Sequence, residues 1–148
     1  MKQTPLKAKE VNKLFSGIEL NKKDQVVLAE DENKKLILIN KEPCFFYYKD
    51  RLIPTLRLLQ SKDLLKKITV DMGAIKFVVN GADIMRPGIT KIEEGIEKDE
   101  AVVIVDENNQ KPLAVGIALF SSEEMKITSS GKVIKNIHFV GDEIWKIE

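Results

Sequence analysis

The segment at residues 70–90, VDMGAIKFVVNGADIMRPGIT, constrains the fold more than any other part of the chain. Asp71 predicts a helix N-cap, because its carboxylate can accept a free backbone N–H of the first turn. The apolar run at residues 74–79 then favours a short, mostly buried helix, although its β-branched side chains also suit a strand. Asn80-Gly81 should end that helix, because both residue types tolerate positive φ.

The second part of this segment predicts an extended strand that stops at a tight turn. Ile84, Met85 and Arg86 form the expected strand. Pro87-Gly88 should end it, because proline lacks a backbone donor and glycine permits a sharp turn. By spacing alone, an ordinary strand-helix-strand unit explains the whole segment without any binding role.

The residues before this segment predict a small α+β domain. Thr4-Pro5 should start a helix that Gly17 ends, since proline is tolerated in a first helical turn. Pro54 should start a second, amphipathic helix that continues toward Leu65. Between the two helices, β-branched and aromatic runs predict three strands, of which the first two form a hairpin, at residues 25–29, 36–40 and 44–48.

The residues after the segment predict a mostly β domain. Gly116 inside an apolar run marks a bulge or a close contact. Ser121 should cap a short helix, and Gly141-Asp142 should form a hairpin turn between the last two strands. The predicted strands are residues 101–105, 113–120, 133–140 and 143–147. Several short strands with few helices favour a small barrel or sandwich.

Charge is distributed unevenly along the chain, although the net charge is only +1. Residues 1–70 hold 15 basic and 9 acidic side chains, whereas residues 71–148 hold 9 and 14. A basic half can contact phosphate and an acidic half can face a basic protein, but both can equally be solvated surfaces. A single cysteine, no N-terminal signal and no long apolar run predict a soluble, cytoplasmic protein without a membrane partner.

No arrangement of residues predicts catalysis, a metal site or a cofactor. His138 is the only histidine and lies in a predicted strand, where a structural role is the usual one. Without a cysteine nearby it cannot build a zinc site, and no nucleophile motif accompanies it. Cys44 lies in an apolar run and resembles a buried side chain more than a nucleophile. Phosphate-binding and dinucleotide-binding glycine motifs are also missing from the sequence.

Four motifs together resemble the malignant T-cell amplified sequence family of translation factors and its archaeal relatives. Residues 70–89 resemble the opening of that family's PUA domain, residues 113–116 (LAVG) an internal strand, and residues 135–145 (KNIHFVGDEIW) the closing hairpin. Residues 53–59 (IPTLRLL) resemble the segment that precedes the domain. The resemblance implies an α+β fold, with a small N-terminal α+β domain at residues 1–66 and a C-terminal PUA β-pseudobarrel at residues 67–148.

The resemblance also implies a function. Members of this family bind RNA, act on the small ribosomal subunit, help to place or release tRNA in initiation, re-initiation or recycling, and can work with a SUI1-domain protein. Catalysis and cofactors are not expected. An alternative is an accessory subunit that positions RNA for an enzyme modifying tRNA or rRNA. A third hypothesis is a protein-interaction module that uses residues 44–48 as an apolar docking strip.

The RNA face that the resemblance implies comprises the first helix, the glycine turn, the second strand and part of the last strand. Arg86 fits best, because its planar guanidinium can bind phosphate or a guanine edge; a surface ion pair with Asp83 is the alternative. An acidic loop at residues 93–100 would weaken phosphate binding if it lay near this face. The predicted RNA-binding residues are Lys76, Gly81, Ala82, Arg86, Pro87, Gly88, Trp145 and Lys146.

Overall fold

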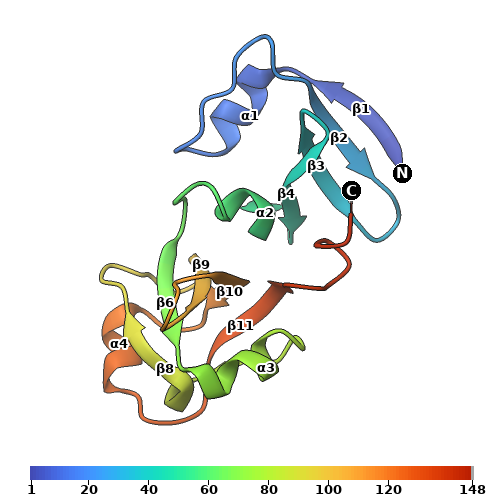
Figure 1. The fold of residues 1–148 in the computed structure, drawn as a ribbon. Coiled ribbons are helices and arrows are strands. Elements are labelled where there is room, and N and C mark those ends of the chain that lie inside the picture. The colour runs from blue at the N-terminus through green and yellow to red at the C-terminus, as the bar shows by residue number, and fades with distance from the viewer. Residues whose placement is uncertain (148) are drawn as a thin grey trace. The chain divides into compact units, whose positions relative to one another are not determined.

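The computed structural model describes residues 1–147 and divides into two compact units. The first unit comprises Met1–Leu64 together with Ile147, and the second comprises Leu65–Lys146. Each unit is built on one sheet with a few short helices (Figure 1). No helix within residues 1–147 is long and apolar enough to cross a membrane.

The first unit is a five-stranded antiparallel sheet in the order β1-β2-β3-β4-β5. Its core contains Val11, Ile37 and Phe45, which are fully buried, and the Phe15 ring lies 5.1 Å from the Phe45 ring. The elements are β1 (Lys2–Leu6), α1 (Ala8–Leu14), β2 (Val26–Glu30), β3 (Lys35–Ile39), β4 (Glu42–Tyr48), β5 (Arg51–Pro54) and α2 (Leu56–Leu59). The three strands predicted here are therefore confirmed as β2, β3 and β4.

Both predicted helix starts in this unit are wrong, for a similar reason. Pro5 lies in β1, which is an edge strand, and an edge strand tolerates proline because one side of it needs no donor. Pro54 ends β5, the other edge strand. The second helix instead starts after Thr55, whose hydroxyl accepts a hydrogen bond from the backbone N–H of Leu58, and it ends at Leu59 instead of continuing toward residue 65.

The third hypothesis, an apolar docking strip at residues 44–48, is also contradicted. These residues form most of β4, which lies inside the sheet between β3 and β5. Phe45 is fully buried and Phe46 is 3% exposed, so these two rings belong to the interior, and only Tyr47 and Tyr48 of the aromatic side chains are partly exposed.

The second unit is a six-stranded mixed sheet in the order β7-β11-β10-β9-β6-β8, with β6 and β9 parallel. Its core contains Ile68, Ile104, Met125 and Ile134, all fully buried. The elements are β6 (Lys66–Val70), the 3-10 turn η1 (Met72–Ala74), α3 (Ile75–Val78), β7 (Ile84–Met85), the 3-10 turn η2 (Arg86–Gly88), β8 (Ile89–Ile92), β9 (Ala101–Asp106), β10 (Pro112–Ala118), α4 (Ser122–Ile127) and β11 (Lys132–Phe139).

The strands at residues 101–105, 113–120 and 133–140 are confirmed as β9, β10 and β11. The predicted cap is confirmed as well: Ser121 and Glu124 form a reciprocal capping box at the start of α4. The final strand at residues 143–147 is wrong, because the chain turns there and Lys146 donates its N–H to the Asp142 carbonyl. The sequence pattern did not indicate β8, which pairs with β6 directly after the Pro-Gly turn.

Gly116 fulfils both of its predicted roles. The pairing of β10 with β11 shifts register between Val115 and Gly116, so there is an irregularity in the strand. A Cβ atom added to Gly116 would lie 2.4 Å from Ile134 Cγ2 and 2.9 Å from the Lys135 carbonyl oxygen. The two strands can therefore approach this closely only because residue 116 has no side chain.

Gly116→Ala should destabilise the second unit by about 1–3 kcal/mol, the usual cost of forcing an extra methyl group into a packed interior. Gly73→Ala is a matched control, because its Cβ would meet only Asp71 Oδ1 at an ordinary 3.5 Å. Thermal unfolding of both variants measures the difference. If Gly116→Ala unfolds at the same temperature as the wild type, the two strands can move apart without a loss of stability.

Candidate nucleic-acid interface

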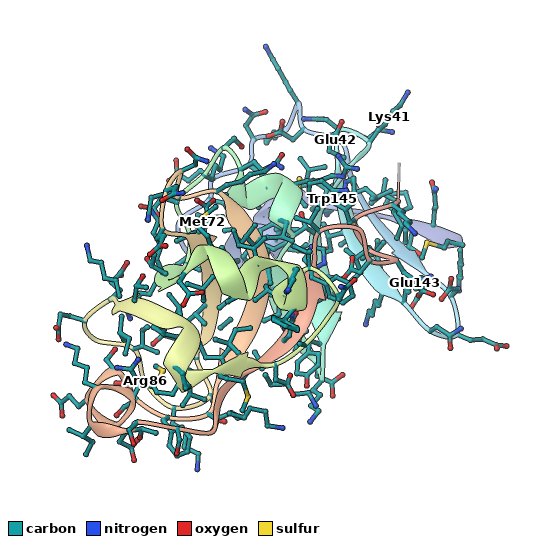
Figure 2. The ribbon with its side chains drawn as sticks, turned by 60° about the horizontal axis from the view of Figure 1, so that its bottom comes forward. Lys41, Glu42, Met72, Arg86, Glu143 and Trp145 are labelled. Atoms are coloured by element: carbon teal, nitrogen blue, oxygen red, sulfur yellow. The ribbon has the colours of Figure 1, made fainter. Side chains whose placement is uncertain are left out.

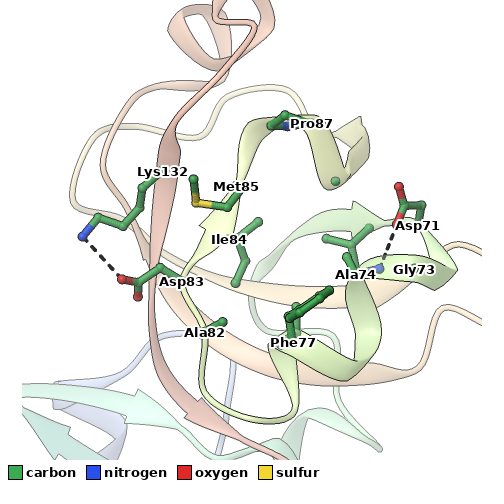
Figure 3. Close-up of a pocket in the computed structure, with 13 residues that line it drawn as sticks. Asp71, Gly73, Ala74, Phe77, Ala82, Asp83, Ile84, Met85, Pro87 and Lys132 are labelled. Carbon is green, nitrogen blue, oxygen red and sulfur yellow. Dashed lines mark hydrogen bonds and ion pairs between the residues drawn. The ribbon is translucent and has the colours of Figure 1, made fainter.

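An apolar groove of about 890 Å³ lies in the second unit between α3 and the segment formed by β7 and η2 (Figure 3). Phe77 and Met85 line it from opposite sides, and 58% and 51% of these two side chains are exposed. Large apolar side chains that remain exposed around one groove commonly mark a binding surface. Most of the other lining residues are small or apolar: Val70, Gly73, Ala74, Val78, Ala82, Ile84, Pro87 and Gly88.

The α3 wall of the groove begins as the sequence predicts. The Asp71 carboxylate accepts a hydrogen bond of 2.9 Å from the backbone N–H of Ala74, which confirms the predicted cap. The expectation of a mostly buried helix is wrong, because only Val78 of α3 is buried. Phe77 precedes Val78 and therefore points about 100° away from it around the helix, into solvent.

The turn after α3 is confirmed as a positive-φ turn. Gly81 has φ +91°, and its N–H donates to the Val78 carbonyl at 3.0 Å. A Cβ atom on Gly81 would lie 2.9 Å from Phe139 Cε1, so this glycine packs against β11. Ala82 differs from it, because Ala82 is exposed and lines the groove.

Asn136 fixes this turn to the sheet, a role that the sequence analysis missed. Its Nδ2 donates to the carbonyls of Val78 and Ala82, both at 3.0 Å, so one side chain holds both ends of the turn. Its backbone N–H donates to Asp83 Oδ1 at 2.9 Å. The only signal in the sequence is an asparagine inside a strand pattern, where this residue type is disfavoured.

Asn136→Ala should loosen the turn and lower the stability of the protein by about 1–3 kcal/mol, because the Ala82 carbonyl would lose its side-chain donor and the Val78 carbonyl would keep only the Gly81 N–H. Amide hydrogen exchange of residues 79–83 and thermal unfolding measure the two effects. Asn80→Ala is the matched control, since exposed Asn80 donates one hydrogen bond, to Lys76 of the same helix. Unchanged exchange in Asn136→Ala would mean that backbone geometry alone holds the turn.

Arg86 lies outside the groove, although both of its chain neighbours line it. Its Nε donates to the Met125 carbonyl at 2.6 Å and its Nη1 to the Ile89 carbonyl at 3.3 Å. The guanidinium therefore caps the last turn of α4. The alternative ion pair with Asp83 is not formed, because Asp83 pairs with Lys132 at 3.4 Å.

The other predicted site residues divide into two groups. Ala82, Pro87 and Gly88 line the groove, and the Nζ of exposed Lys76 lies 5.2 Å from the Phe77 ring beside it. Trp145 and Lys146 lie in the turn after β11, and Figure 2 shows Trp145 well separated from Arg86. The groove thus brings together part of the predicted set, and the RNA contacts of all eight residues stay a prediction.

Comparison with known proteins identifies both parts of the chain. A family model described as the PUA domain matches residues 66–140, and a model described as a domain of unknown function, DUF1947, matches residues 6–68. An uncharacterized protein of Methanocaldococcus jannaschii is 46% identical over 95% of this chain and 88% of its own length. Translation machinery-associated protein 20 of Saccharomyces cerevisiae is 39% identical over 97% of this chain and 86% of its own. The chain belongs to this family of PUA-domain proteins.

Further likenesses agree with that assignment. Malignant T-cell-amplified sequence 1 of Rattus norvegicus is 36% identical over 90% of this chain and 80% of its own, which confirms the predicted resemblance. A hypothetical protein of Pyrococcus horikoshii has the same fold, with a TM-score of 0.84, 37% identity and 99% coverage of both chains. The predicted α+β fold with a C-terminal PUA domain is confirmed. A chain from an H/ACA RNP bound to a substrate RNA matches with a TM-score of 0.53 and 25% identity, over 65% of this chain and 29% of that one.

His138 and Asp142 stabilise the turn at the end of the PUA domain. His138 is fully buried, and its Nδ1 lies 2.8 Å from Asp142 Oδ2. Asp142 also accepts the backbone N–H groups of Phe139 and Trp145 at 3.0 and 2.9 Å. Burial alone would raise the pKa of Asp142, but the bonds from His138 and the two N–H groups outweigh burial and hold this pKa below its ordinary value.

Because the pKa of Asp142 is lowered in the folded protein, its ionised carboxylate adds stability at any pH above the aspartate pKa of the unfolded chain, about 3.9. This stability is lost as the pH falls through the pKa of Asp142 in the folded protein. Asp142→Asn should therefore be less stable at neutral pH and should lose less stability on acidification from about pH 5 to pH 2. Urea unfolding across this range measures both effects. Glu10→Gln, at an exposed position on α1, is the control, and equal pH dependence in Asp142→Asn and wild type would contradict the assignment.

Metal-binding and nucleophilic side chains give no sign of catalysis in the described part of the chain. Within residues 1–147, no group of three or more His, Cys, Asp or Glu side chains could hold a metal ion. Cys44 is partly buried, and this burial raises the pKa of its thiol. A raised pKa leaves little thiolate at neutral pH, so Cys44 is a poor nucleophile.

Proposed function

We propose that this PUA-domain protein binds RNA and acts in translation, on the small ribosomal subunit, on tRNA, or on both, and that the groove receives the RNA. The observation that carries the proposal is the exposed Phe77 ring on one wall of an apolar groove in a PUA domain. The names of the relatives, which associate them with the translation machinery, favour the same reading.

The groove is suited to an unpaired base better than to a duplex. An exposed aromatic ring gives a base a stacking platform that does not depend on its sequence. Exposed Lys76 lies beside the Phe77 ring and can approach a phosphate next to such a base, whereas Lys132 lines the groove paired with Asp83 at 3.4 Å. A site of this kind needs little net positive charge, which agrees with the net charge of +1.

The acidic loop does not oppose this reading. None of its carboxylates lines the groove. Glu93 accepts the backbone N–H of Lys67, Glu94 pairs with Lys126, and Glu100 pairs with Lys66 at 3.0 Å. Because these carboxylates are occupied locally, they repel a phosphate in the groove less than free carboxylates would.

Co-sedimentation with small ribosomal subunits, with and without tRNA and across a salt series, tests the proposal. Wild-type protein should bind in a salt-sensitive way. Phe77→Ala should weaken binding by about 1–3 kcal/mol, roughly 5- to 150-fold, because a base would lose its stacking partner. Leu14→Ala is the control, since Leu14 is exposed to a similar extent, 55%, on α1. Equal binding by Phe77→Ala and wild type would exclude the groove.

A second candidate function is an accessory subunit that positions RNA for a separate modifying enzyme. The likeness to a chain of an H/ACA RNP favours it. Absence of subunit binding, with binding to free tRNA retained and a modifying enzyme recovered in pull-downs, would select this candidate. Recovery of a SUI1-domain protein together with small subunits would select the first.

A further inference from the structure

A second, smaller pocket lies beside the groove in the PUA domain, and three of its side chains are cationic. Its volume is about 220 Å³, and Arg86, Lys91 and Lys126 line it together with Thr90, Ile89 and Ile92. Phosphate is the common biological group that binds several neighbouring cations, whereas the Thr90 hydroxyl already donates to the Thr69 carbonyl at 3.4 Å. A role for this pocket in RNA binding rests on the RNA-binding function proposed above.

Arg86 supplies a fixed cation to this pocket. Its two hydrogen bonds to the carbonyls of Met125 and Ile89 hold the guanidinium in place, and they use two of its five N–H donors. Within residues 1–147, no carboxylate lies within ion-pair distance of it. The guanidinium is therefore held in position and has no counter-ion. An anion can bind to its remaining N–H donors without first displacing a carboxylate.

Lys91 and Lys126 add charge from two other elements. Lys91 is exposed on the edge strand β8 and has no acidic partner in the described part of the chain. Lys126 lies on α4 and pairs with exposed Glu94, so it can share its charge with a ligand. Counting Glu94, the three cations leave the pocket with a net positive charge.

The groove and this pocket share one wall. Met85 and Pro87 line the groove, whereas Arg86 between them lines the pocket, so successive residues of one segment face opposite sides. An RNA strand that places a base against Phe77 and crosses this segment brings its backbone to Arg86 and Lys91. We propose that the pocket binds a phosphate group of the RNA strand whose base occupies the groove.

The test uses Lys91, because an Arg86 variant would also lose the cap of α4 and would confuse binding with folding. RNA affinity of the full chain is measured against salt concentration for wild type, Lys91→Ala and the exposed control Lys98→Ala. Lys91→Ala should bind several-fold more weakly at low salt, and the slope of log affinity against log salt should fall by about 1, the value for one lost phosphate contact. Lys98→Ala should keep the wild-type slope.

The outcomes separate this inference from the function on which it rests. If Phe77→Ala weakens binding but Lys91→Ala keeps the wild-type affinity and slope, the phosphate site is overturned and the RNA-binding function stands. If wild-type protein binds no RNA, both the phosphate site and the RNA-binding function are contradicted.

A titration with inorganic phosphate, followed by the amide NMR signals of Thr90 and Lys91, identifies the source of the phosphate. If inorganic phosphate saturates the pocket but Lys91→Ala leaves the RNA affinity unchanged, the pocket binds the free anion and the proposal is overturned.

Discussion

The groove depends on the two hydrogen bonds that the Asn136 side chain donates to Val78 and Ala82. α3 has only four residues, and a helix this short does not hold its shape by its own backbone bonds. The 3-10 turn η1 that leads into it is tied by the Asp71 cap, and the end of α3 is tied by Asn136, which belongs to the longest strand of the sheet. The wall that carries Phe77 is therefore positioned by the sheet, and the exposed ring is held in place by contacts that lie beneath it.

The opposite wall of the groove, the β7–η2 segment, directs neighbouring side chains to two different surfaces. Across the β7–η2 segment, the side chains of Met85, Arg86 and Pro87 point alternately to the groove and to the cationic pocket. Arg86 and Pro87 belong to the 3-10 turn η2, where successive side chains leave the backbone about 120° apart, so the turn directs them to different surfaces. Arg86 has a second role in this arrangement, since its hydrogen bonds join the segment to α4 and β8. One short segment thus separates an apolar surface from a charged one and connects both to the core.

The sequence predicted those features whose cause is local. Periodicity located β2, β9 and β10, and the caps at Asp71 and Ser121 follow from side chains that bond their own helix. Some errors arose where a distant partner decides the outcome, whereas the strand predicted at residues 143–147 fails because of a local bond from the Lys146 N–H to the Asp142 carbonyl. Pro5 lies in a strand because β1 is at an edge of the sheet. The direction of Arg86 depends on a carbonyl at residue 125, far along the chain, and no local pattern contains that information.

The proposed division of the RNA site into an apolar groove and a cationic pocket would allow a chain with a net charge of +1 to bind a polyanion. Stacking in the groove depends little on salt, because no counter-ion is released from an apolar surface. Contacts with phosphate release counter-ions and weaken as salt rises. A protein that combines one stacking platform with few phosphate contacts gains affinity without the strong attraction to any nucleic acid that a highly basic surface produces.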